Sequence, residues 1–149
     1  MMVTKILIAI YIILYISHII LGPYYYTFLI KNQPIKYRSK NIVDALKHMV
    51  YVTYISFLFT IYFLYNPNPE TFVCAFLVTL YSLITYIIIY KQDSEHFVES
   101  IILHTILFVP FIFYKFYYNI QLNKFKPRFL TYFTIIFLII YSFIYQYIY

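Results

Sequence analysis

The residues best suited to chemistry lie in one apolar stretch, Ser94–Tyr118, which contains His96, Glu99 and His104. His96 and His104 are about two helical turns apart, so a helix places both on one face, with Glu99 beside it. Imidazole and carboxylate groups can bind a transition metal or transfer protons. Strongly polar groups inside a membrane are costly unless they face protein or water. We therefore expect this segment to be the central helix of a membrane bundle.

The spacing of these two histidines indicates no metal site. At a rise of about 1.5 Å per residue, His96 and His104 differ in depth by about 12 Å, which is too far for one ion. Glu99 is the one acid that we expect inside the membrane, and ionisable groups there mark paths for protons. A proton- or ion-conducting subunit that uses Glu99 and His96 is therefore one hypothesis for the function.

Another pair of histidines, His18 and His104, has the chemistry to bind a b-type haem between two helices. Haem iron accepts imidazole ligands, and antiparallel helices place these two residues within roughly 10 Å of each other in depth. Glycine lets the flat macrocycle approach a helix, but Gly22 is the only glycine in the sequence. A haem or quinone-site anchor in electron transfer is thus an alternative, and a histidine that bonds across helices, with no cofactor, is the simpler interpretation.

Motifs for other chemistry are absent from the sequence. We find no serine-nucleophile motif and no phosphate-binding loop, so we expect no enzyme activity from this chain by itself. The single cysteine, Cys74, excludes an internal disulfide, and its place in an apolar run predicts a buried, unreactive thiol.

Composition indicates a membrane protein. Of 149 residues, 64% are hydrophobic and 11% are charged, whereas about a quarter of a soluble domain is charged. The net charge of +6 comes from cations in loops and at helix ends, a distribution that does not favour nucleic-acid binding. We therefore predict an all-α, polytopic integral membrane helix bundle that contacts membrane lipids.

Apolar runs of roughly twenty residues define about five transmembrane helices in one domain, residues 1–149. Proline cannot continue a helix, so Asn66-Pro67-Asn68-Pro69 predicts a tight turn between the second and third. Basic loops are expected at 31–43 and 119–128. The expected helices are approximately 6–30, 44–65, 71–90, 95–118 and 129–149.

Three of these helices carry a stripe of small or hydroxyl side chains on one face. Small residues allow close approach of two backbones, and hydroxyl groups can bond between helices. We therefore expect these stripes at helix contacts. They are Thr53, Ser56 and Thr60; Ala75, Thr79 and Ser82; and Thr131, Thr134 and Ser142 with Gln146 nearby.

Cations are nearly balanced between the two expected sides of the membrane, so the positive-inside rule does not orient the chain. Either the number of helices differs by one from five, or neighbouring proteins hold the chain in place. The second explanation, together with the lack of a catalytic set, favours a subunit of a larger complex.

The residue usage is strongly biased, with 21 Tyr and 16 Phe against one Gly and no Trp. In composition the chain resembles the mitochondrially encoded respiratory-chain membrane subunits of protists with AT-rich genomes, ciliates especially. The resemblance implies an accessory or structural subunit of an energy-transducing complex, with other membrane subunits and bound lipids as partners. It implies the mitochondrial inner membrane as location, and a bacterial cytoplasmic membrane is the alternative.

Overall fold

The computed structural model describes residues 2–3, 5–13, 16–17, 40–90 and 108–148, with side chains left out at 40–50, 86, 88–90, 113 and 145–148. All regular elements in these ranges are helical, which confirms the predicted all-α class. Within the same ranges, no helix combines the length and the apolarity that a membrane crossing requires. The elements are α2 (Lys40–Tyr65), α3 (Pro69–Tyr90), α5 (Val109–Tyr117), the 3-10 helix η2 (Leu122–Lys124) and α6 (Phe129–Ile148), and residues 5–13 are also helical.

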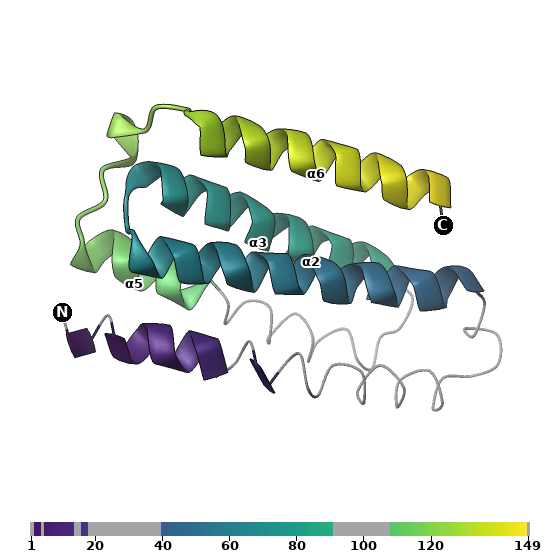
Figure 1. Ribbon diagram of the computed structural model, residues 1–149, viewed down its shortest axis with the longest axis horizontal. Coiled ribbons are helices and arrows are strands. Elements are labelled where there is room, and N and C mark those ends of the chain that lie inside the picture. The colour runs from purple at the N-terminus through teal and green to yellow at the C-terminus, as the bar shows by residue number, and fades with distance from the viewer. Residues whose placement is uncertain (1, 4, 14–15, 18–39, 91–107, 149) are drawn as a thin grey trace.

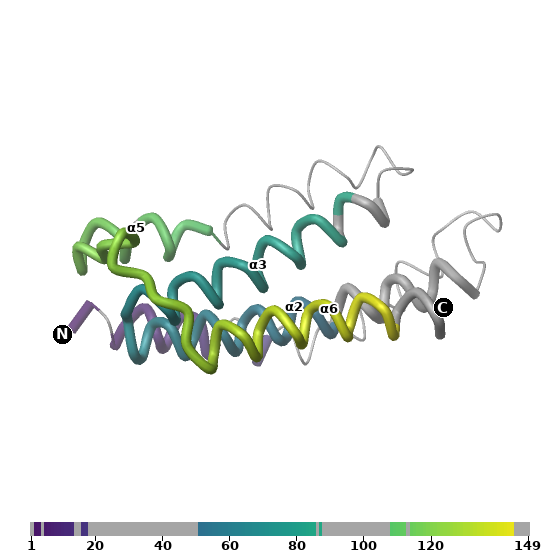
Figure 2. Tube along the Cα trace, turned by 90° about the horizontal axis from the view of Figure 1, so that it is seen from above, coloured from purple at the N-terminus to yellow at the C-terminus, as the bar shows by residue number. Residues whose placement is uncertain are grey.

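The helices form an elongated bundle around α3. Helices α2 and α3 are an antiparallel hairpin, and α6 packs on α3 (Figure 1). The α2–α3 turn, α5, η2 and the first residues of α6 gather at one end of the bundle, where residues 2–3 also lie (Figures 1 and 2). We call this the loop end.

Side-chain caps explain why α3 begins earlier than predicted, at Pro69. The Asn68 Oδ1 atom accepts hydrogen bonds from the backbone N–H groups of Glu70 and Thr71, both at 3.0 Å, and proline is favoured at the first helical position. The Thr71 hydroxyl donates to the carbonyl of Asn66 at 2.7 Å, which closes the turn. The predicted turn is therefore present, and its second proline belongs to the helix.

The start of α2 also differs from the prediction, because the helix begins at Lys40 and includes part of the expected basic loop 31–43. No proline or glycine lies between Pro34 and the predicted start at 44, so nothing in the sequence stops the helix there.

Helix α5 corrects the predicted continuous helix 95–118. It begins at Val109, with Phe108 as N-cap and Pro110 in the first turn. Proline lacks the N–H group that a helix interior needs and fits the first turn, so it marks a helix start here rather than a position inside a helix. The residues from 95 to 107 lie outside the described residues.

Asn119 ends α5 in the left-handed conformation, with φ of 48°. The N–H of Ile120 then bonds to the carbonyl of Lys115 at 3.1 Å, which is the pattern of a Schellman C-cap. Ile120 is buried against the core, so this cap fixes the direction in which residues 121–128 leave α5.

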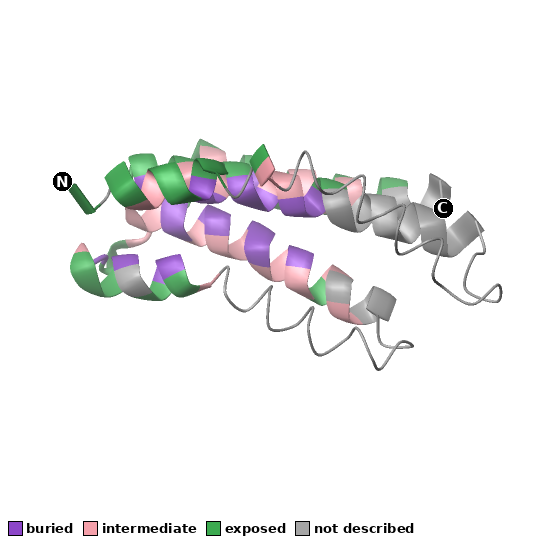
Figure 3. Cartoon of the chain, turned by 90° about the horizontal axis from the view of Figure 1, so that it is seen from below, coloured by how far each residue is buried: buried purple, intermediate pink, exposed green. Residues whose placement is uncertain are grey.

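An aromatic cluster, made of Phe63, Phe72, Phe111 and Tyr114, holds the loop end together. The Phe63 ring lies 5.4 Å from Phe72 and 5.6 Å from both Phe111 and Tyr114, between centroids. These residues come from α2, α3 and α5, so one cluster joins three helices. Buried side chains continue along the inner faces of α2 and α3 (Figure 3).

Candidate functional site

The residues that the sequence singles out for chemistry, His18, His96, Glu99 and His104, lie outside the described residues. The haem hypothesis and the proton-path hypothesis therefore stay predictions. In the part of the chain that the structure describes, no three histidine, cysteine or carboxylate side chains come together as metal ligands.

The hydroxyl stripes of α2 and α3 do meet, as predicted, in a buried hydroxyl seam formed by Thr53, Ser56, Thr79 and Ser82. Ser56 and Thr79 share a hydrogen bond of 2.7 Å between their oxygens, and Thr53 and Ser82 share one of 3.3 Å. The Thr79 hydroxyl donates to the carbonyl of Ala75, so the Ser56 hydroxyl is the donor to Thr79. The seam satisfies polar groups inside the bundle and holds two helices in register.

The stripe of α6 faces α3, also as predicted. Ser142 shares a hydrogen bond of 2.8 Å with the Tyr81 hydroxyl, and Thr131 and Thr134 are buried. Cys74 is buried, as expected, and its thiol donates to the Thr131 hydroxyl at 3.9 Å. These contacts explain why hydroxyl side chains recur on the inner face of α6.

Glu70 links the starts of α3 and α6. One carboxylate oxygen accepts the backbone N–H of Thr131 at 3.3 Å and its hydroxyl at 3.1 Å. No acidic residue occurs in the first turn of α6 itself. Glu70 therefore supplies, from another helix, the negative charge that is favourable at a helix N-terminus.

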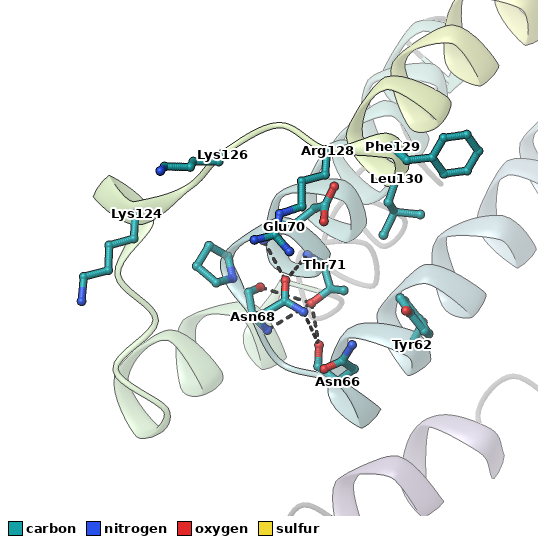
Figure 4. A pocket seen from close by; sticks show the side chains of 11 residues that line it. Tyr62, Asn66, Asn68, Glu70, Thr71, Lys124, Lys126, Arg128, Phe129 and Leu130 are labelled. Atoms are coloured by element: carbon teal, nitrogen blue, oxygen red, sulfur yellow. Dashed lines mark hydrogen bonds between the residues drawn. The ribbon is translucent and has the colours of Figure 1, made fainter.

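Beside Glu70 the structure forms an open pocket of about 520 Å³ between the α2–α3 turn and the segment that leads into α6. Arg128 and Glu70 both line it, and the side chains of Lys124 and Lys126 point outward from its edge (Figure 4). We call this the basic pocket. It is lined by Tyr62, Asn66, Asn68, Pro69, Glu70, Thr71, Lys124, Lys126, Arg128, Phe129 and Leu130.

The charge of the basic pocket suits binding of an anion. Its lining contains three cations and a single carboxylate, and that carboxylate already accepts two hydrogen bonds from Thr131. Lys124, Lys126 and Arg128 are exposed, and none forms an ion pair with a carboxylate of the described residues.

No protein-family model matches the chain, and no curated protein or solved structure shows significant similarity to it.

Sequence reasoning missed the basic pocket because its parts are far apart along the chain. It treated Lys124, Lys126 and Arg128 as markers of topology and gave Glu70 no role. One local signal was available, since Asn68 followed by Pro69 is a cap that places Glu70 in the first turn of a helix. Nothing local indicates that this turn lies beside residues 124–130.

Proposed function

We propose that this protein is a non-catalytic, membrane-embedded subunit of a larger assembly, held in an energy-transducing membrane such as the mitochondrial inner membrane. One observation carries the proposal: in the middle of the bundle, the exposed side chains of α6 are apolar, and hydroxyl groups are buried beside apolar side chains between the helices. A water-soluble helix bundle instead exposes polar side chains, because burial of apolar surface drives its folding.

The outer face of α6 supports this proposal most directly. Every exposed residue of this helix between 129 and 144 is Phe, Tyr or Ile. A continuous apolar face of this kind is unusual on a monomeric soluble protein and marks contact with lipid or with another protein. The exposed residues are Phe129, Tyr132, Phe133, Ile135, Ile136, Ile139, Ile140, Phe143 and Ile144.

The interior supports it in a second way. All buried polar residues among those described are Ser or Thr. Between helices in lipid, where no water competes, small hydroxyl side chains allow close packing and supply hydrogen bonds. Ser56 with Thr79, and Ser142 with Tyr81, are such bonds across helix pairs.

Two further features support the proposed role of a subunit. The described residues include no catalytic set, and the apolar outer face of α6 suits neighbouring helices as well as lipid. The biased composition points in the same direction, because respiratory-chain membrane subunits of AT-rich protist genomes share it.

The test is native mass spectrometry of the protein extracted from its own membrane in mild detergent, with an optical spectrum of the same sample. We expect an assembly larger than one chain, without a chromophore that belongs to this chain. A single chain that carries no partner contradicts the proposal.

Two further results would replace the proposal with an alternative. A Soret band that disappears in His104→Ala and persists in the matched variant His96→Ala would identify a haem anchor. Ion flux into liposomes that falls in Glu99→Gln would identify a conducting subunit. Unchanged flux in that variant and no Soret band are the expected results.

A further inference from the structure

We infer that the basic pocket binds the phosphate group of an anionic phospholipid. This inference rests on the membrane location in the proposed function and adds a specific ligand site to it. The ligand class follows from three features of the pocket: its charge, its size and its apolar surroundings.

Charge is the first feature. Lys124, Lys126 and Arg128 give the pocket an excess of two positive charges over the carboxylate of Glu70. Glu70 is engaged by Thr131, and the cations have no carboxylate partner among the described residues. A phosphate oxygen is the natural partner for an arginine fork and for lysine ammonium groups.

Size and hydrogen-bonding capacity are the second feature. A volume of about 520 Å³ is in the range of pockets that hold small ligands. In the lining, the Asn68 amide uses one N–H to reach the Asn66 carbonyl at 3.3 Å, and its other N–H has no partner among the described residues. Asn68 therefore adds a neutral hydrogen-bond donor to the basic pocket, which suits the glycerol and phosphate oxygens of a lipid headgroup.

The apolar surroundings distinguish a lipid from free phosphate. Phe129 and Tyr62 line the pocket and are 83% and 48% exposed. Along α2 and α6 the exposed apolar surface continues from them through Leu58 and Phe133. A headgroup in the pocket leaves acyl chains beside these residues, whereas a free phosphate would make no use of them. Exposed tyrosines at this end, Tyr65 and Tyr117, have the amphipathic character of residues at a headgroup layer.

The experiment places the full chain in nanodiscs of phosphatidylcholine with a minor fraction of phosphatidylglycerol and measures by native mass spectrometry which lipids stay bound. We expect the lipid that stays bound to the wild type to contain a larger fraction of phosphatidylglycerol than the disc contains. Each cation near a membrane surface changes binding by about fivefold, so Arg128→Gln should lower this preference by about that factor. The triple variant Lys124→Gln, Lys126→Gln, Arg128→Gln should abolish it.

The matched control is Lys115→Gln, which removes one exposed cation from α5 at the same end and leaves the pocket lining intact. Its lipid preference should stay at the wild-type level. If Lys115→Gln and Arg128→Gln lose the preference for phosphatidylglycerol equally, the preference comes from general charge attraction. The basic pocket is then not the binding site. Circular dichroism of each variant in the disc verifies that the helices are retained.

A competition experiment distinguishes the phosphate of a lipid headgroup from free inorganic phosphate. Excess inorganic phosphate should leave the bound phosphatidylglycerol in place, and its displacement would make the pocket a site for free anions. If the chain enters the discs but shows no headgroup preference, only the inference that the basic pocket binds an anionic phospholipid is wrong. Failure of the chain to incorporate at all overturns the membrane location and this inference together, and the size of the extracted assembly tests the subunit role separately.

Discussion

The middle of the bundle and its loop end differ in where they place polar groups. In the middle, Ser56 and Thr79 are buried while Ile139 and Ile140 on α6 are exposed. At the loop end, the aromatic cluster around Phe63 is buried and cations are exposed. Among the side chains that the structure describes, exposed cations therefore gather at the loop end, whereas the outer face of α6 in the middle is apolar.

This difference in the position of exposed charges has a simple physical reason if the two regions meet different surroundings. Hydrocarbon accepts apolar side chains and excludes unsatisfied polar groups, so hydroxyls must bond within the bundle. A headgroup layer accepts charged groups and tyrosine, and there an apolar cluster is stable inside. The proposed membrane location thus accounts for both regions, and the variants below test each one.

The largest effect is expected at the loop end, for Phe63→Ala. Phe63 is fully buried and touches three other rings, and removal of a buried phenyl group costs about 3–5 kcal/mol. The loss should appear as a lower free energy of unfolding in an SDS titration of mixed micelles. Phe143→Ala, at a ring that is 55% exposed, is the control and should change stability by less than about 0.5 kcal/mol. Equal losses in the two variants would show that the aromatic cluster does not hold this end together.

The next effect is expected on the outer face of α6, for Ile139→Asp. An acidic residue at the centre of a membrane helix costs about 2.5–3.5 kcal/mol of insertion free energy, so the inserted fraction should fall in a membrane-insertion assay. Ile139 is 51% exposed, and in a water-soluble protein the same change at an exposed site would be nearly neutral. Leu122→Asp, in η2 at the loop end, is the control and should insert normally. Normal insertion of both variants would contradict the membrane location of α6.

A smaller effect is expected at the turn, for Asn68→Ala. The variant loses the Oδ1 atom that caps two N–H groups of α3, which costs about 1 kcal/mol of stability. The same unfolding titration measures it. Asn66→Ala, at a neighbouring exposed side chain that makes no bond in the described structure, should have little effect. A cap role for Asn68 is excluded if the two alanine variants are equally stable.

The smallest effect is expected in the hydroxyl seam, for Thr79→Val. Hydrogen bonds between membrane helices contribute on average about 0.6 kcal/mol, because the hydroxyl groups also find partners in the unfolded state within the membrane. A double-mutant cycle with Ser56→Ala measures this coupling between Ser56 and Thr79. Thr85→Val, at a half-buried position of α3, should show no coupling with Ser56→Ala. Coupling energies of equal size in the two cycles would mean that the seam bond is not specific.

Much of the helical framework could be predicted from the sequence, since the signals for it are local. Proline positions and apolar runs predicted the turn between α2 and α3 and the start of α6, and hydroxyl spacing predicted the faces that meet in the seam. The start of α5 could not be predicted, because proline is compatible both with a kink inside a helix and with a helix start.

The sequence by itself determined an all-helical chain with hydroxyl stripes, because helix period and proline chemistry act over a few residues. Only the tertiary structure decided that Glu70 reaches Thr131, 61 residues away, and that Arg128 comes to lie over the α2–α3 turn. The direction of residues 121–128 depends on the left-handed Asn119 and on the burial of Ile120 in a core built by α2, α3, α5 and the helix at residues 5–13. Contacts between distant segments depend on how whole faces pack, and no local pattern around Glu70 or Arg128 contains that information.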